Sequence, residues 1–147
     1  MVYGAARRHT YEQPSQTYSL RLIDVETGQE LRRFIGHEEP AESVTFSPDG
    51  RFALSGSRDK RAIAWDVSSS QPVYHLDNPA AVGSVAYSPT GHLAAMGSYD
   101  GNIVLWEAAS GNVLCHLVGH TGPIISMVFT PDGQSLLSAC PDDTVRE

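Results

Sequence analysis

Short apolar runs recur along the chain at a regular interval, and each run ends at the same kind of turn. A tetrapeptide of the form Ser/Thr-Pro-Asp/Thr-Gly follows these runs at 47–50, 88–91 and 130–133, in steps of 41 and 42 residues. A period of this size indicates an array of one copied supersecondary unit, which cannot bury its own faces alone.

Each period divides into four short strands separated by turn residues, which predicts an all-β structure. Proline at the second turn position has a fixed φ that suits a type I or II turn, and the glycine can adopt positive φ. The expected strands fall near 17–24, 29–35, 42–47, 51–57, 61–66, 72–76, 83–88, 92–98, 102–107, 112–118, 124–130 and 134–140.

The third strand of each complete unit is apolar on both faces. Four consecutive apolar residues run from Ile103 to Trp106, and the strand near 61–66 is similar. Such a strand is buried on both faces, and a sheet packed between two other sheets provides that burial.

Composition narrows the class of protein. The 147 residues are 41% hydrophobic and 18% charged, which is typical of a soluble globular domain, and no apolar run is long enough to cross a bilayer. The net charge of −7 disfavours nucleic acid as a partner, because that requires a basic face. Cys115 and Cys140 occupy unrelated positions in the repeat, so neither a zinc site nor a disulfide framework is expected. We interpret the setting as reducing and cytoplasmic.

Several motifs recur in the same order within the period. In the first complete copy, a Gly-His pair at 36–37 precedes the turn, Asp59 precedes the third strand, and Trp65-Asp66 ends that strand. In these motifs and their spacing the chain resembles the tryptophan–aspartate (WD) repeat family of β-propellers. The resemblance covers 17–147 and implies an all-β fold, a partial β-propeller of four-stranded antiparallel blades with about three and a half repeats.

The resemblance divides the chain into a lead-in and four blade segments. These are 1–16 (a mobile N-terminal lead-in), 17–35 (the end of a blade), 36–76 and 77–118 (full blades) and 119–147 (a truncated blade). Closed propellers contain about 4–8 blades, so we expect a fragment of a longer propeller. Two alternatives stay open: a truncated gene model, or assembly in which 17–35 of one copy completes 119–147 of another. The expected partners therefore include further blades in cis or copies in trans.

The incomplete blades at the two ends are expected to expose apolar side chains. Exposed patches of this kind mark an interface or an aggregation hazard. The candidates are Leu20, Leu22 and Phe34 at one end and Val128, Leu136 and Val145 at the other.

The WD family has a histidine, a serine or threonine, an aspartate and a tryptophan that form a hydrogen-bonded structural tetrad within a blade. Carried over residue by residue, the first full blade supplies His37, Asp59 and Trp65. Ser55 and Ser57 share one face of a strand, so both stay open as the serine. The counterparts in the later repeats are Asn78, Ser98, Asp100 and Trp106, followed by His120, Ser138 and Asp142. Because an asparagine replaces the histidine, the second tetrad is expected to be weaker.

No pattern in the sequence indicates catalysis, a metal or a cofactor. The serine, histidine and aspartate residues are assigned to buried structure, and the sequence has no Gly-x-Ser-x-Gly motif. The glycines mark turns between strands, so a phosphate-binding loop is not expected. His37-Glu38-Glu39 is the nearest approach to a metal site, but the tetrad uses His37 and the glutamates belong to an exposed loop.

The family resemblance places partner binding on one edge of the blades. That edge is built by the loops that join the second strand to the third and the fourth strand to the next blade. The residues expected there are Glu38, Glu39, Arg58, Lys60, Tyr99 and Thr121. The implied function is a non-catalytic scaffold that binds other proteins or peptides. The alternative is a regulatory or sensor propeller segment of a larger enzyme whose catalytic domain lies outside this chain.

Overall fold

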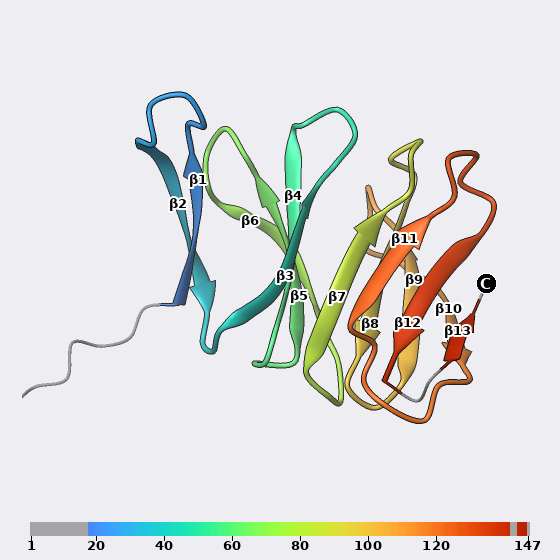
Figure 1. Ribbon diagram of the computed structural model, residues 1–147. Coiled ribbons are helices and arrows are strands. Elements are labelled where there is room, and N and C mark those ends of the chain that lie inside the picture. The colour runs from blue at the N-terminus through green and yellow to red at the C-terminus, as the bar shows by residue number, and fades with distance from the viewer. Residues whose placement is uncertain (1–17, 142–143, 147) are drawn as a thin grey trace, which may run out of the picture.

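The computed structural model describes residues 18–141 and 144–146, and every regular element in these ranges is a β-strand (Figure 1). The lead-in expected at 1–16 lies outside the described residues. Among the described elements there is no helix with the length and apolar character to cross a membrane. The all-β class predicted from the sequence is confirmed.

The described strands form four antiparallel sheets, which we number in chain order. The first sheet pairs β1 (Tyr18–Ile23) with β2 (Glu30–His37). The second contains β3 (Ala41–Phe46), β4 (Phe52–Ser57), β5 (Arg61–Asp66) and β6 (Pro72–Asp77). The third contains β7 (Val82–Tyr87), β8 (Leu93–Ser98), β9 (Asn102–Glu107) and β10 (Val113–Val118). The fourth contains β11 (Ser126–Phe129), β12 (Leu136–Cys140) and β13 (Thr144–Arg146).

Within each sheet, strands that follow one another in sequence are hydrogen-bonded neighbours. Figure 1 shows the sheets standing side by side, from blue at the first sheet to red at the fourth. The first strands of neighbouring sheets lie close together, because β3 contacts β7 and β7 contacts β11. This is the arrangement of successive propeller blades, and the predicted four-stranded antiparallel blades are confirmed in the second and third sheets.

The repeated tetrapeptide builds the turn between the first and second strands. Gly50 N donates to Ser47 O at 2.9 Å, and Phe52 N donates to Ser47 Oγ at 3.0 Å. Gly50 has a φ of +70°, a left-handed conformation that glycine adopts without steric cost. The same turn recurs at Gly91 and Gly133. The residues that carry the sequence period therefore also fix the hairpins.

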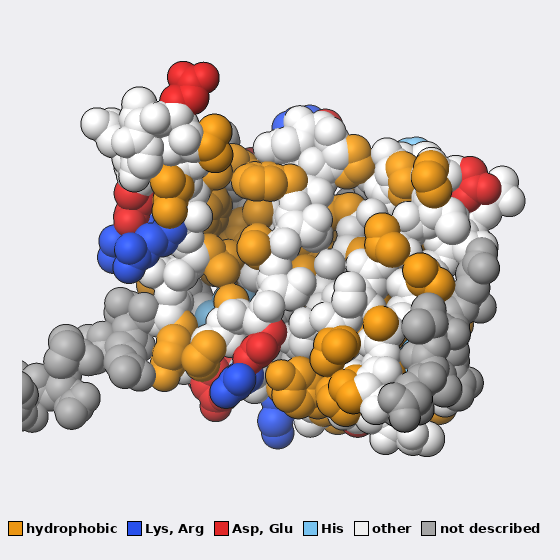
Figure 2. Space-filling view, in the orientation of Figure 1, with side chains coloured by type: hydrophobic (Ala, Val, Ile, Leu, Met, Phe, Trp, Pro, Cys, Tyr) orange, Lys and Arg blue, Asp and Glu red, His pale blue; other side chains and the backbone are white. Residues whose placement is uncertain are grey.

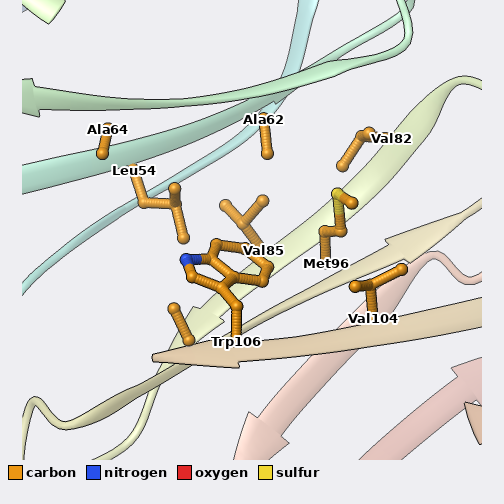
Figure 3. Close-up of a cluster of buried hydrophobic side chains, with 9 residues drawn as sticks. Leu54, Ala62, Ala64, Val82, Val85, Met96, Val104 and Trp106 are labelled. Atoms are coloured by element: carbon orange, nitrogen blue, oxygen red, sulfur yellow. The ribbon is translucent and has the colours of Figure 1, made fainter. Parts of the chain in front are cut away.

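The core lies between the sheets, with Trp65 between the first and second sheets and Trp106 between the second and third. Trp106 of β9 is fully buried and packs with Leu54 and Ala62 of the second sheet and with Val85 and Met96 of its own (Figure 3). An aromatic side chain of this size buries about 150–250 Å². Trp106 therefore packs against the second sheet as well as against the other strands of its own sheet.

Trp65 of β5 occupies the corresponding place between the first and second sheets. Its ring meets that of Phe34 edge to face, with centroids 5.8 Å apart. The expectation that Phe34 is exposed is therefore wrong, since the side chain is 4% exposed beneath the tryptophan. The exposed large apolar side chains of β2 are instead Leu31 and Ile35.

The other apolar residues expected at the ends of the array are exposed to different degrees. Leu20 and Leu22 are partly buried against the Trp65 cluster. At the opposite end Val128 is exposed as expected, whereas Leu136 is partly buried against Ile124 and its neighbours. The side chain of Val145 lies outside the described part of the chain.

Candidate functional site

One edge of the array collects all six residues predicted to bind a partner. Because successive strands run in opposite directions, the loops β2–β3, β4–β5, β6–β7, β8–β9 and β10–β11 share that edge, which we call the rim. Glu38 and Glu39 lie in the first of these loops, Arg58 and Lys60 in the second, Tyr99 in the fourth and Thr121 in the last. All six residues are exposed.

Ion pairs fix the charged part of the rim. Arg58 Nε donates to Glu42, the second residue of β3, and the arginine side chain stays 56% exposed. Arg61, the first residue of β5, contacts both Glu38 and Asp77, at 3.3 and 3.2 Å. Glu42 raises the pKa of Arg58, so this guanidinium remains charged at any physiological pH.

Tyr99 forms the aromatic part of the rim and is close enough to Arg58 for its hydroxyl to interact with the guanidinium. Its ring covers Gly83, where an added Cβ would lie 2.8 Å from Tyr99 Cε1 and 2.6 Å from the Ile124 carbonyl oxygen. Only glycine admits so close an approach. Tyr99 is 41% exposed, and Ile125 is 58% exposed. Figure 2 shows hydrophobic side chains next to acidic and basic ones at the lower end of this face, where the rim lies in Figure 1.

Two further predicted rim residues, Glu39 and Lys60, act through the backbone. Glu39 O accepts a hydrogen bond from Ser57 Oγ at 3.0 Å. Lys60 has a φ of 68°, and its carbonyl accepts from Asn78 N at 2.8 Å. These bonds tie the loops of the rim to one another. The structure thus brings Arg58 and Tyr99 together, whereas Glu39 and Lys60 hold the loops.

Beneath the rim, a connected hydrogen-bonded cluster joins the second sheet to His37, the last residue of β2 in the first sheet. Trp65 Nε1 donates to Ser55 Oγ at 2.8 Å, and Ser55 Oγ lies 2.7 Å from His37 Nε2. His37 Nδ1 lies 2.7 Å from Asp59 Oδ2. The bonds form a continuous chain when His37 carries its proton on Nδ1 and Ser55 donates to Nε2. Of the two serines left open by the sequence, Ser55 meets the indole, and Ser57 instead donates to the carbonyls of the β2–β3 loop.

The environment of Asp59 keeps its carboxylate ionised. Burial acts to raise the pKa of Asp59, but hydrogen bonds from His37 and from the backbone N–H groups of Glu38 and Arg61 outweigh it, so the pKa falls below its usual range. The carboxylate therefore joins the rim loop to the buried cluster through Glu38 N, at 3.0 Å.

The third sheet does not form the predicted cluster of Asn78, Ser98, Asp100 and Trp106. Met96 stands where Ser55 stands in the second sheet and offers the indole no strong acceptor. Trp106 Nε1 instead donates to Tyr74 Oη at 3.0 Å, and Tyr74 Oη donates to Ala108 O at 2.7 Å. Burial raises the pKa of Tyr74, so its hydroxyl stays protonated and can donate.

The other three predicted members make local bonds. Ser98 Oγ donates to Asp100 and to Asn102 O, and Asn78 Nδ2 donates to Ala80 O at 2.8 Å. In place of the cluster, Ser98 and Asp100 stabilise a local turn, and the Trp106 indole bonds to Tyr74 of the second sheet. The sequence did not predict Tyr74 as the acceptor because Tyr74 belongs to the second sheet and Trp106 to the third. Alignment of the repeats compares equivalent positions and does not show which residues of neighbouring sheets meet.

The fourth sheet repeats the beginning of the cluster. His120 Nε2 lies 3.0 Å from Ser138 Oγ, and both side chains are buried. Asp142 lies outside the described residues. Over the part of the chain that the structure describes, no three His, Cys, Asp or Glu side chains gather to hold a metal ion.

Comparison with known proteins gives a consistent result. The sequence matches the family described as "WD domain, G-beta repeat" at 28–66, 70–107 and 111–146. It is 30% identical over 131 residues to the small ribosomal subunit protein RACK1 of Schizosaccharomyces pombe, a match that covers 84% of this chain and 42% of that protein. It is 30% identical over 142 residues to eukaryotic translation initiation factor 3 subunit I of Culex quinquefasciatus, covering 87% and 43%.

A shorter match carries higher identity. The chain is 45% identical over 58 residues to the nuclear distribution protein PAC1 of Arthroderma otae, covering 40% of this chain and 13% of that protein. The chain therefore spans less than half the length of each of these curated relatives.

Proposed function

This chain belongs to the WD-repeat family, and we propose that it acts as a non-catalytic scaffold that binds other proteins through the rim. The observation that carries the proposal is the pairing of Arg58 with Tyr99. Both are exposed, and both are held from below, Arg58 by Glu42 and Tyr99 by the backbone at Gly83. Tyrosine and arginine are enriched among residues that dominate binding energy at protein interfaces.

The chemistry of the rim favours a partner segment with an apolar side chain next to a hydrogen-bond acceptor. Tyr99 and Ile125 supply the apolar contact. A guanidinium has five N–H donors, and the bond to Glu42 uses the one on Nε. Because the rim residues are already ordered by the sheets, little conformational entropy is lost when a partner binds.

Two further observations support a scaffold. The side chains that would be needed for nucleophilic chemistry, Ser55 and His37, are buried and bonded to one another. Two of the relatives are named as a ribosomal subunit protein and as a subunit of an initiation factor, which places those proteins in assemblies. The alternative, a sensor segment of a larger enzyme, gains no support from the matched proteins.

The experiment compares the proteins that bind to the immobilised chain and to its variants, by quantitative mass spectrometry of extracts from the source organism. Arg58→Ala and Tyr99→Ala should each weaken binding of the same set of proteins by about tenfold or more, the size of an interface hot spot. Arg51→Ala is the matched control, since Arg51 is exposed in the β3–β4 turn on the opposite edge. The proposal is wrong if both rim variants keep every partner, or if Arg51→Ala loses the same set.

A further inference from the structure

A pocket of about 340 Å³ opens between the first and second sheets, on the edge opposite the rim. One side is formed by β2, and the other by the β3–β4 and β5–β6 turns. Two arginines face one another across it, although the chain has a net charge of −7. The residues that line the pocket are Arg32, Gly50, Arg51, Asp66, Val67 and Ser68.

Within the described residues, Arg32 and Arg51 form no ion pair with a carboxylate. The other arginines whose side chains the structure describes each form one, and these are Arg21, Arg33, Arg58 and Arg61. Asp49 is close to Arg51 in sequence, but it accepts hydrogen bonds from Ser47 Oγ and from the backbone N–H of Arg51. Both guanidinium groups of the pocket therefore keep their N–H donors for another acceptor.

Arg32 is directed into the junction by the alternation of β2. It shares a face of the strand with Phe34, whose ring packs on Trp65 of the second sheet. Arg33 is on the other face, where it donates to Glu30 at 2.8 and 2.9 Å. Adjacent arginines of one strand thus have different surroundings, and only Arg32 lines the pocket.

Arg51 is held in place from the second sheet. Its guanidinium carbon lies 5.6 Å from the centre of the Phe52 ring, a cation–π contact that fixes the group without using an acceptor atom. Val67 N donates to Arg51 O at 3.0 Å and so joins the two turns that line the pocket. Arg51 is therefore ordered before any ligand arrives.

Asp66 is the one acidic residue among the six that line the pocket. Its Oδ1 accepts from Ser68 Oγ at 2.6 Å and from Ser69 N at 2.8 Å, so the carboxylate is bound within its own turn. The lining carries two positive charges and one negative charge. This balance favours an anion, and most of all an anion with two charges.

The arginine pair is not required by the packing of the blades. Counterparts of Arg32 and Arg51 one repeat later, at a step of 41 residues, are Val73 and His92. Two repeats later, at a step of 83 residues, they are Cys115 and Gln134. The sheets pack side by side at these junctions without an arginine at either position, so the pair serves a purpose other than the fold.

We propose that this pocket binds the phosphate group of a phosphorylated serine or threonine side chain on a partner peptide, with Arg32 and Arg51 donating to its oxygens. A phosphate monoester has nearly two negative charges at neutral pH and three acceptor oxygens, and the fork of an arginine can bind it with two parallel hydrogen bonds. Both arginines are exposed, so a peptide can present the group at the surface. The pocket and the rim are on opposite edges, and either can fail without the other.

The first test titrates a short peptide, with one phosphoserine among alanines and glycines, into the ¹⁵N-labelled full chain. The buffer has physiological ionic strength and contains no phosphate or sulfate. Charges more than about 8 Å apart are largely screened under these conditions, so the net charge of the chain does not mask the pocket. Saturable NMR shifts are expected for the Gly50 and Ser68 amides and for Nε of Arg32 and Arg51, and none with the unphosphorylated peptide. The absence of saturable shifts, or shifts confined to other residues, overturns the proposal.

Two further ligands separate the phosphate from its carrier. A peptide with glutamate in place of phosphoserine should bind about tenfold more weakly or worse, because a carboxylate has one charge and two oxygens. Inorganic phosphate should also bind more weakly, since the pocket leaves room for peptide atoms beside the phosphate. Equal binding of the glutamate peptide contradicts phosphate recognition, and equal or tighter binding of inorganic phosphate contradicts a peptide as the carrier.

Variants locate the binding. Arg32→Ala and Arg51→Ala should each weaken binding of the phosphopeptide about tenfold or more, the size of a hydrogen bond to a charged group. Arg33→Ala is the matched control, since it removes the same charge from the opposite face of β2 and should change the affinity less than about twofold. If Arg33→Ala and Arg32→Ala weaken binding equally, only the net charge matters and the pocket is not the site.

Asp66→Asn gives a change of the opposite sign. Removing the one negative charge of the lining should strengthen binding of the phosphopeptide, a result that partial unfolding cannot produce. Weaker binding by a folded Asp66→Asn variant, as judged by circular dichroism, would contradict the proposal. In the extract experiment, Arg51→Ala should lose phosphorylated proteins and keep the set that depends on Arg58 and Tyr99.

Discussion

Replacing Ser55 by alanine tests the buried cluster of the second sheet directly. Ser55 is fully buried, accepts the indole N–H of Trp65 at 2.8 Å and lies 2.7 Å from His37 Nε2. The alanine variant leaves both nitrogens buried without this partner. Each such loss costs about 1–3 kcal/mol, so we expect a total of about 2–6 kcal/mol, a large share of the roughly 5–15 kcal/mol that stabilises a domain.

Ser57→Ala is the matched comparison. Ser57 is on the same strand and is also fully buried, but its hydroxyl donates to the carbonyls of Glu39 and Pro40, which belong to exposed residues, and accepts from the partly buried Asp59 N at 3.1 Å. Water can replace the lost donor at those carbonyls, so the expected cost is about 0.5–1.5 kcal/mol. The two variants carry the same substitution two residues apart on the same face of one strand.

Thermal unfolding of the full chain, followed by circular dichroism and tryptophan fluorescence, measures both variants. The midpoint of Ser55→Ala should fall on the order of 10 °C and that of Ser57→Ala by a few degrees. If Ser57→Ala is as destabilising as Ser55→Ala, the indole does not depend on Ser55, and the assignment of the cluster is wrong. Unchanged midpoints in both variants would show that the cluster contributes nothing measurable.

Three further predictions use the same unfolding assay. Asp59→Ala should lower the midpoint more than Asp100→Ala, because Asp59 bonds to His37 whereas Asp100 bonds within its own turn; the reverse order would contradict this. Tyr74→Phe should cost about 1–2 kcal/mol by removing the partner of the Trp106 indole, and Tyr87→Phe, a half-buried control, should cost less. Ser68 and Ser69 lower the pKa of Asp66 from 3.8 to about 2. The folded chain thus binds fewer protons than the unfolded chain in this window and loses stability as the pH falls from about 4 to 2, a slope that Asp66→Asn should flatten.

The strands and turns could be predicted because their signals are local. A Pro-x-Gly turn and an alternation of apolar residues depend only on neighbours in sequence, so the hairpins at 47–50, 88–91 and 130–133 lie where expected. The choice between Ser55 and Ser57 was not local. Both share a face, and only the packing of Trp65 against β4 separates them.

Contacts between sheets were the main source of error. Phe34 was expected to be exposed because it belongs to the incomplete blade at one end of the array, but the ring of Trp65 packs against it. On the rim, Glu42 and Arg61 were missed because they belong to strand ends and not to loops. The Glu42–Arg58 pair follows from the antiparallel register of β3 and β4, which brings Ala41 opposite Ser57. The Arg61–Asp77 pair follows from the register of β5 and β6, in which these two residues lie opposite one another. A β-bulge between Ala41 and Ser43 shifts the first register and one between Ala64 and Trp65 shifts the second, so counting residues from the turns alone gives neither pair.

Because of the bond from Trp106 to Tyr74, the two complete repeats of this chain cannot be exchanged for one another without loss. The acceptor of Trp65, Ser55, belongs to the same repeat. This hydrogen bond therefore does not depend on which repeat comes before it. Trp106 depends on a tyrosine of the repeat before it, and Arg33 and His116 stand at the counterparts of that tyrosine. A gene rearrangement that exchanged the order of the two repeats would therefore leave the Trp106 indole without its acceptor. The present order of the repeats thus limits which duplications or exchanges of repeats this chain can tolerate.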